Sequence, residues 1–563
     1  MEIGEILKKH GLLTDQQLSA TRDQANGSGR LDQIAVELGF VTEEAALRAV
    51  GTEVGLDYID LADADVDLTL LQAFPKQIMH REAVFPVCRK DGSLVVATSD
   101  PTNLYAIDEI ASETGASIEP VLANRIEIQK LIKTHFGVGS ETISGLLKAD
   151  EEKDEDDVQF LDDVDMDGSE LSEMIQEPSV IRLVNEILVE ALEARTSDVH
   201  IESQEAGLKV RYRIDGILQR QPVPPEINRY ANAIVSRLKI MARLNIAEKR
   251  LPQDGRIKLR VSGREVDVRV SVIPMIHGEG IVMRILDKGR MKFDLKSLGM
   301  EDDQYAIFHD VISRPHGIIL VTGPTGSGKT TTLYSALEEI KSEGTKIITT
   351  EDPVEYQLPG INQIQVHSKI GFTFSASLRA ILRHDPDIVL VGEIRDLETA
   401  ENAIQASLTG HLVFSTLHTN DAASAYTRLV DMGVEPFLVA STVEAVMAQR
   451  LVRTLCNKCK EAYKPNLDEL PPTFPKDKLT GDLFQPGGCK DCRHTGYAGR
   501  VGICELMVTS EAVRELAQDR ASSWKVRNAA IKDGMIGLQD DGWRKVLAGK
   551  TTVDEVLRVA KGH

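Results

Sequence analysis

A glycine-rich segment carries the clearest chemical signal in this sequence. Residues 323–330 fit the pattern G-x-x-x-x-G-K-[ST] at every fixed position, directly after the apolar run 318–321. Glycines in such a loop let backbone N–H groups close around phosphates, and the following helix offers its positive N-terminus to the same anion. Lys329 is expected to meet the β- and γ-phosphate oxygens, and Thr330 to ligate Mg²⁺. The expected nucleotide-binding residues are Gly323, Pro324, Thr325, Gly326, Ser327, Gly328, Lys329, Thr330 and Thr331.

Acidic side chains follow two later apolar runs, at the strand ends where an open α/β sheet places its ligand groups. Residues 351–355 supply three acids, one of which could orient the attacking water, and the run 387–391 ends in Gly392 and Glu393. Many nucleoside triphosphatases have aspartate where Gly392 stands, so Glu393 is expected to reach Mg²⁺ through water. His418 ends a fourth run, where an imidazole could respond to the γ-phosphate.

Four of the six cysteines form two Cys-x-x-Cys pairs, Cys456/Cys459 and Cys489/Cys492. Four thiolates close a tetrahedral zinc shell with no open position, which predicts a structural Zn²⁺ site. Disulfides and a redox pair are the alternatives, and a reducing cytosol disfavours the first. Cys504 and His494 are nearby reserve ligands.

Short continuous apolar runs position these residues. The runs 318–321, 347–348, 388–391 and 412–414 alternate with helical stretches and lack polar alternation. Strands of that kind are buried on both faces, so a parallel sheet covered by helices is expected. By contrast, the runs 210–214 and 266–270 alternate basic and apolar residues, which places arginines on one sheet face.

Charge and length divide the chain further. With 563 residues it is too long for one core, and it carries 65 basic against 87 acidic residues. Residues 150–177 hold 14 carboxylates and one lysine, which predicts a flexible acidic linker. No apolar run approaches a membrane span and the start lacks a signal peptide, so a cytosolic location is expected. Net acidity and 4 % aromatic residues argue against a general nucleic-acid coat.

The first 55 residues contain a weak repeat with an offset of 28, in which each copy reads as helix, glycine stop, threonine cap and helix. Thr14 with Gln17 fits a capping box, whereas Thr42 is a cap without that partner. Short apolar runs between about 58 and 137 alternate with helical stretches, which predicts a small α/β unit.

The motifs together carry a family resemblance. The phosphate loop, the segment 351–355, the segment 390–396 and the segment 409–419 are similar to the Walker A, Asp-box, Walker B and His-box motifs of the secretion ATPase superfamily, in the same order. The N-terminal extension and the four-cysteine insertion resemble the type II secretion and type IV pilus assembly ATPases. The resemblance implies an α/β multidomain fold: a RecA-like P-loop ATPase core, a preceding α/β (PAS-like) domain, an N-terminal helical plus small α/β domain, and a tetracysteine zinc insertion.

The expected domains follow from this resemblance and the composition. They are 1–140, an N-terminal docking domain; 141–177, the acidic linker; 178–292, a second N-terminal α/β domain; 293–450, the RecA-like ATPase domain; 451–510, the zinc segment; and 511–563, a C-terminal helical segment.

The resemblance also implies catalytic roles. It makes Glu355 the base or water-orienting group, with Glu351 and Asp352 in support, and places Glu393 on the Mg²⁺ side and His418 at the γ-phosphate.

Arginines of the preceding domain or of a neighbouring subunit meet the phosphates in this family. Arg269 and Arg284 are the expected residues, with Arg264 and Arg428 as less secure candidates. A trans arginine is worth about 10³–10⁵ in rate.

Related N-terminal domains bind cyclic di-GMP through a repeated motif that begins Arg-Leu-Gly and ends in Gln. This sequence departs from it: Glu2 replaces the arginine of the first copy, Asp32 replaces the glycine of the second, and Ala25 and Glu53 stand where glutamine is expected. Carboxylates repel a bis-phosphate, so protein docking rather than cyclic di-GMP binding is expected.

The expected function is a homohexameric cytoplasmic motor that hydrolyses ATP to power pilin or pseudopilin assembly. Its expected partners, an inner-membrane platform protein and a membrane-anchored docking protein, hold it peripherally at the inner membrane.

The alternative is a nucleic-acid translocase on the same core, which needs a basic channel with stacking aromatics. The acidic balance and the confinement of both tryptophans, Trp524 and Trp543, to the tail oppose it. A module that holds nucleotide without turnover is a third reading, opposed by the intact motif residues.

Overall fold

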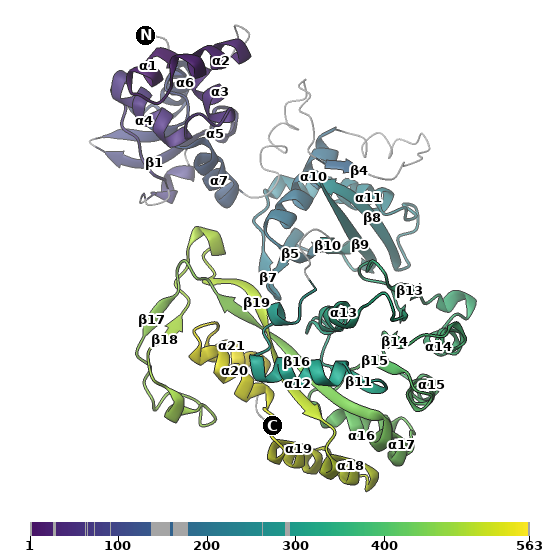
Figure 1. Cartoon of the computed structure of the whole chain (residues 1–563). Helices are drawn as coiled ribbons and strands as arrows, with labels where there is room; N and C mark the ends of the chain where they lie inside the picture. The colour runs from purple at the N-terminus through teal and green to yellow at the C-terminus, as the bar shows by residue number, and fades with distance from the viewer. Residues whose placement is uncertain are drawn as a thin grey trace. The chain divides into compact units, whose positions relative to one another are not determined.

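A computed structural model describes residues 3–25, 30–136, 158–160, 178–287 and 293–560, except positions 62–63, 65, 73, 91 and 262. The chain divides into two compact units, Met1–Leu286 and Asp287–His563 (Figure 1). Within the described ranges, no helix has both the length and the apolar character needed to span a membrane.

The N-terminal repeat forms four helices, as the sequence predicts. They are α1 (Ile3–Lys9), α2 (Asp15–Ala25), α3 (Leu31–Glu37) and α4 (Glu43–Val54). Gly11 and Gly39 follow the first helix of each copy with φ of 72° and 71°, a conformation that glycine adopts without steric cost. The capping box is confirmed, because Gln17 N–H donates to Thr14 Oγ1 and Thr14 N–H donates to Gln17 Oε1. Thr42 caps α4 through the N–H of Ala45.

A small three-stranded sheet follows, in the order β1-β2-β3. Strands β1 and β2 are antiparallel and β2 and β3 are parallel. The elements are α5 (Lys76–Glu82), β1 (Val84–Lys90), β2 (Ser93–Thr98), α6 (Leu104–Thr114), β3 (Ile118–Leu122) and α7 (Arg125–Phe136). This is the small α/β arrangement that the alternating runs predict.

A seven-stranded sheet with the order β4-β8-β9-β10-β5-β6-β7 comes next. Its elements are β4 (Val158–Phe160), α10 (Pro178–Glu193), β5 (Thr196–Gln204), β6 (Gly207–Ile214), β7 (Ile217–Arg220), α11 (Ala231–Met241), β8 (Gln253–Val261), β9 (Arg264–Met275) and β10 (Gly278–Asp287). Val210 and Tyr212 are buried in a core shared with α10 and α11, whereas Arg211 and Arg213 are partly exposed on the other face. The alternation of basic and apolar residues therefore places these arginines on one face of the sheet, as predicted.

The expected acidic linker, 141–177, lies outside the described residues except for β4. That strand pairs antiparallel with β8, with Gln159 opposite Arg260.

The second unit is built on another seven-stranded sheet, in the order β13-β12-β14-β15-β11-β16-β19. Every pair from β13 to β16 is parallel, and β19 is antiparallel to β16. The strands are β11 (Gly317–Thr322), β12 (Ile347–Glu351), β13 (Asn362–Gln365), β14 (Ile388–Val391), β15 (Leu412–Leu417), β16 (Val443–Leu455) and β19 (Tyr497–Val508). The four apolar runs identified in the sequence are β11, β12, β14 and β15, and their predicted parallel arrangement is confirmed.

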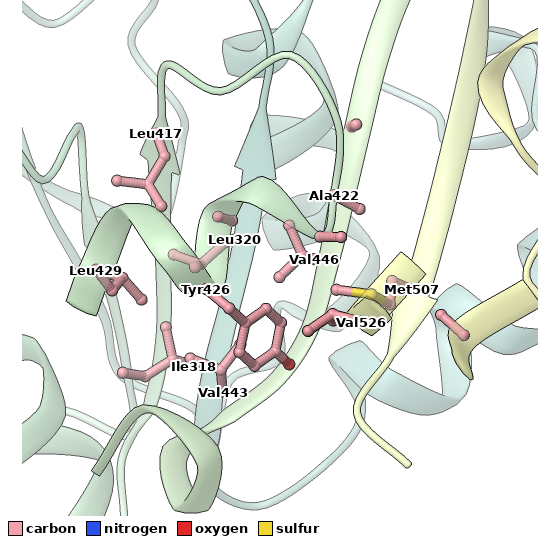
Figure 2. Packing of buried hydrophobic residues seen from close by; sticks show 14 of the residues in the cluster. Ile318, Leu320, Leu417, Ala422, Tyr426, Leu429, Val443, Val446, Met507 and Val526 are labelled. Atoms are coloured by element: carbon pink, nitrogen blue, oxygen red, sulfur yellow. The ribbon is translucent and has the colours of Figure 1, made fainter. Parts of the chain in front are cut away.

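Helices cover both faces of this sheet, so alternate residues of one strand enter different cores. Ile319 and Val321 of β11 pack in a cluster with α12 (Asp302–Ile312) and α13 (Lys329–Ile340). Ile318 and Leu320 enter the opposite cluster, which Figure 2 shows with Tyr426 and Val446. The helices of that second face include α14 (Phe374–Ile381), α15 (Leu397–Leu408), α16 (Ser424–Asp431) and α17 (Pro436–Thr442).

The cysteine segment is continuous with this sheet. β16 runs across the expected domain boundary at residues 450/451, and β19 returns from the cysteine segment to pair with it. Between them lies the two-stranded sheet of β17 (Glu461–Tyr463) and β18 (Leu483–Gln485). The chain closes with α18 (Glu511–Gln518), α19 (Ser523–Lys532), α20 (Leu538–Leu547) and α21 (Val553–Val559). Short 3₁₀ helices span Leu68–Gln72, Pro225–Tyr230, Lys296–Leu298, Ser368–Ile370, Leu382–His384, Lys476–Lys478 and Lys490–Cys492.

Candidate functional site

A pocket of about 150 Å³ opens where β11, β12, β14 and β15 end. Parallel strands deliver their carboxyl ends to one edge, which explains why motifs far apart in the sequence meet there. The pocket is lined by Lys329, Thr330, Leu333, Tyr334, Glu351, Asp352, Pro353, Glu355, Phe374, Leu390, Gly392, Glu393, Thr416 and His418. The lysine, the four acidic residues and the histidine that the sequence predicts at the strand ends are all in that set.

The phosphate loop connects β11 to α13 and depends on its glycines. Gly323 and Gly328 have φ of 148° and 92°, and a Cβ on Gly323 would lie 2.6 Å from the carbonyl oxygen of Gln449. A side chain there would therefore collide with β16. The loop also buries Ser327, whose Oγ has no hydrogen-bond partner among the described residues. A closely packed loop in which the buried Ser327 hydroxyl still lacks a hydrogen-bond partner among the described residues is compatible with a bound phosphate group.

Lys329 begins α13 and lies over its own loop. Its Nζ donates to the carbonyl oxygens of Gly323 at 2.8 Å and Pro324 at 3.2 Å. Burial lowers the pKa of Lys329, and the nearby Glu393 carboxylate opposes that effect. The ammonium group is therefore held at the loop by carbonyl oxygens that a phosphate can replace.

Two glutamates of the 351–355 segment have different environments. Glu351 is 4 % exposed and accepts hydrogen bonds from Thr349 Oγ1 at 2.6 Å, Gln363 Nε2 at 3.1 Å and the hydroxyl of Tyr334. Burial raises its pKa, although these hydrogen bonds act in the opposite direction. Glu355 lies beyond the end of β12, is partly buried and lines the same pocket. Glu351 is thus held in the pocket wall by its hydrogen bonds, whereas Asp352 and Glu355 line the pocket beyond the end of the strand.

Glu393 follows β14 and is largely buried, with a side chain 13 % exposed. Its carboxylate lies 2.5 Å from Arg395 Nη2 and 3.4 Å from His418 Nε2. A Cβ on the preceding Gly392 would lie 3.2 Å from both the Phe374 ring and the carbonyl oxygen of Thr350. A side chain at position 392 would therefore require the Phe374 ring or the Thr350 backbone to shift by a few tenths of an ångström.

Sequence reasoning missed Gln449 and Arg450, two polar residues inside the mostly apolar strand β16. Gln449 Oε1 accepts a 2.6 Å hydrogen bond from Thr332 of α13, which fixes the helix that follows the phosphate loop. Arg450 donates to the backbone and side-chain oxygens of Asn420, two residues after His418. The only signal for them was this polar interruption of an apolar run.

The predicted arginines are distributed over both units. Arg284 on β10 is half-exposed and its Nε donates to Asp198 Oδ1 at 3.0 Å. Arg269 on β9 is partly buried and stands opposite Arg256 of β8. Arg264 at the start of β9 is exposed, as is Arg428 on α16 of the second unit. Arg264, Arg269 and Arg284 thus belong to the unit that does not contain the pocket.

The four predicted cysteines form a compact cluster. Their sulfur atoms all lie within 4.8 Å of one another, and three of the pairs are separated by 3.7–3.8 Å. A tetrahedral site with zinc–sulfur distances of about 2.3 Å has sulfur–sulfur edges of about 3.8 Å, so the cluster fits Zn²⁺. Disulfides do not form, since their sulfurs would be about 2.05 Å apart. Cys504 is outside this cluster and its thiol faces Gln304 in the core.

Together, the parallel sheet, the phosphate loop and the acids at its edge define a P-loop ATPase. A sequence profile described as "Type II/IV secretion system protein" matches residues 173–558, and the chain belongs to that family. It is 42 % identical over 564 residues to the type IV pilus assembly ATPase PilB of Myxococcus xanthus, covering 99 % of this chain and 98 % of that protein. It is 43 % identical over 568 residues to type II secretion system protein E of Xanthomonas campestris, with the same coverage. The predicted family and its ATP hydrolase activity are confirmed.

A solved structure supports the fold. The Legionella pneumophila ATPase DotB aligns with a TM-score of 0.51 at 21 % identity, covering 68 % of this chain and 96 % of that one. At this identity the likeness concerns the fold alone.

A second profile, the MshEN domain, matches residues 54–142. The matched range overlaps residues 54–140 of the expected N-terminal domain. It lends no support to the expectation that cyclic di-GMP does not bind, and the repeat positions on which that expectation depends precede the matched range.

Proposed function

We propose that this chain is a homohexameric motor that hydrolyses ATP with Mg²⁺ to power pilin or pseudopilin assembly. It works in the cytoplasm and attaches peripherally to the inner membrane through a platform protein and a membrane-anchored docking protein. The observation that supports this most is the convergence of Lys329, Thr330, Glu355, Glu393 and His418 on one pocket of a P-loop ATPase. The similarity to pilus assembly and type II secretion ATPases over nearly the whole chain supports the biological role.

The pocket residues divide the work of hydrolysis. Lys329 exchanges its bonds to loop carbonyls for bonds to phosphate oxygens, and the loop amides hold the rest of the phosphate chain. Glu355 orients the attacking water and accepts its proton. His418, whose Nε2 lies 3.4 Å from the Glu393 carboxylate, senses the γ-phosphate.

Thr330 and Glu393, which both line the pocket, would hold Mg²⁺, the first through its hydroxyl and the second through water. The bound ion would supply positive charge that neutralises the phosphate oxygens during hydrolysis. Both side chains offer oxygen atoms, the ligands that Mg²⁺ prefers. Cys456, Cys459, Cys489 and Cys492 would hold Zn²⁺ in a structural role.

The assignment of Glu355 is tested by comparing Glu355→Gln with Glu351→Gln. Glu355→Gln is expected to lower kcat by about 10²–10⁴-fold while nucleotide affinity and melting temperature stay close to wild type, because it removes only a proton acceptor. Glu351→Gln is expected to lower the melting temperature, since it disturbs a buried network of three hydrogen bonds. Steady-state hydrolysis, fluorescent-nucleotide binding and thermal melts measure the three quantities. Normal turnover in Glu355→Gln would refute the assignment.

The translocase alternative gains nothing from the relatives, which are secretion and pilus ATPases. Stimulation of hydrolysis by single-stranded DNA would revive it.

A further inference from the structure

Arg450 joins two parts of the nucleotide pocket that the sequence separates by almost a hundred residues. Its Nη2 donates to the carbonyl oxygen of Asn420 at 2.9 Å and to Asn420 Oδ1 at 3.2 Å. Its Nη1 donates to the carbonyl oxygen of Gln449, and a Cβ built on Gly323 would lie 3.1 Å from this same nitrogen. The guanidinium group therefore lies against the first residue of the phosphate loop while it holds the segment that follows His418.

A second link connects the same two parts. Thr322, the last residue of β11, accepts a 2.8 Å hydrogen bond from the N–H of Thr419, and the two threonine hydroxyls are 2.7 Å apart. Farther along, the N–H of Ala422 donates to the buried Glu505 of β19. Residues 419–422 are thus tied to β11, β16 and β19, and His418 is the exposed residue directly before this anchored segment.

We propose that Arg450 is a positioning residue for ATP hydrolysis, which fixes the segment carrying His418 at a set distance from the phosphate loop. The planar guanidinium suits this task because one terminal nitrogen can bond Asn420 while the other faces the loop. The proposal rests on the proposed role of His418 at the γ-phosphate.

The cationic charge of Arg450 has a separate effect on the pocket. It lies close enough to Lys329 to lower the pKa of that lysine further. A second cation at the phosphate loop attracts the negatively charged nucleotide whatever the orientation of the Arg450 side chain. Arg450 therefore contributes to the pocket both by its charge and by its position. A lysine at position 450 separates the two contributions, because it keeps the positive charge and lacks the two planar donor nitrogens.

The test compares Arg450→Lys and Arg450→Ala in the full-length chain, with ATP as the probe. Arg450→Lys is expected to bind nucleotide as wild type does but to have a kcat lowered about ten-fold, the size of one lost charge-assisted hydrogen bond. Arg450→Ala is expected to lose both affinity and kcat. Full recovery of kcat in Arg450→Lys would overturn the positioning role and leave only an effect of charge.

A double-mutant cycle with Asn420→Ala tests the partner. This substitution removes the Oδ1 acceptor and leaves the carbonyl oxygen, so its effect on kcat should be smaller than that of Arg450→Ala and should vanish in the Arg450→Ala background. Additive effects would contradict the proposal.

Arg453→Ala is the matched control on the same strand. Arg453 bonds Glu555 of α21 instead of the pocket, so its loss should lower the melting temperature and leave kcat unchanged. An equal loss of kcat in Arg453→Ala would show that β16 as a whole, and not Arg450, sets the rate.

A wild-type chain that fails to hydrolyse ATP would refute the proposed function, whereas an active wild type with unaffected Arg450 variants refutes only this inference.

Discussion

Two glutamates of the same segment have different surroundings in this structure. Glu351 and Glu355 stand four positions apart, yet Glu351 is enclosed by three hydrogen-bond donors and Glu355 lies in the wall of the pocket beyond the strand. A carboxylate that is already satisfied and buried is poorly suited to move a proton from water.

Glu555 gives a pH-dependent contribution to stability. Burial opposes its ionised form, but hydrogen bonds from Arg558 and Arg453 outweigh that effect and lower its pKa from 4.5 to about 2. The ionised carboxylate therefore stabilises the folded chain fully above about pH 4.5, and this stabilisation is lost as the pH falls toward 2. Glu555→Gln should flatten the fall in melting temperature between pH 4.5 and pH 2 and lower the melting temperature at pH 7.

Thermal melts across that pH range check this expectation. Asp554→Asn, which removes an exposed carboxylate from the same helix, is the control and should keep the wild-type dependence. An unchanged slope in Glu555→Gln would contradict the assignment.

At the scale of elements, β16 and β19 join the ATPase sheet to the cysteine cluster. Cys456 follows β16 directly, and β19 begins five residues after Cys492. Farther out, Phe474 packs edge-to-face against the buried Trp543 of α20, with ring centroids 5.3 Å apart. The cysteine cluster therefore closes a loop whose two ends are β16 and β19, the last two strands at one side of the sheet.

Removal of the metal should loosen that loop first. Cys456→Ser is expected to lose the roughly one Zn²⁺ bound per chain and to become sensitive to protease between residues 456 and 496, because structural zinc contributes about 10–16 kcal/mol in small peptides. Metal analysis and limited proteolysis measure both. Cys88→Ser, in the other unit, is the control and should retain zinc. Retention of zinc by Cys456→Ser would contradict the four-thiolate site.

At the scale of the whole molecule, the proposed hexamer raises the question of which subunit completes each site. Arg269 and Arg284 belong to the unit Met1–Leu286, and Lys329 belongs to Asp287–His563. An arginine that meets phosphates from a neighbouring subunit makes hydrolysis depend on assembly. Such a motor should show a specific activity that rises with protein concentration.

Mixing two inactive variants tests this arrangement. Lys329→Ala and Arg269→Ala are each expected to reduce turnover at least 10²-fold, and their mixture should regain activity because some interfaces combine an intact phosphate loop with an intact Arg269. Arg260→Ala, which removes an arginine that pairs with Glu265 on the neighbouring strand, should stay active alone. A mixture no more active than the two variants apart would rule out Arg269 as a trans residue.

The sequence by itself determined the features that depend on local chemistry. The phosphate loop, the cysteine pairs, the strands buried on both faces and the capped N-terminal helices each leave a short pattern, because their residues are neighbours in the chain. The tertiary structure alone decided which glutamate is enclosed and that the sheet continues through the cysteine segment. It also placed Gln449 and Arg450, more than a hundred residues after the phosphate loop, against that loop. These are contacts between distant strands, and long-range pairing leaves no periodic mark in the residues that form it.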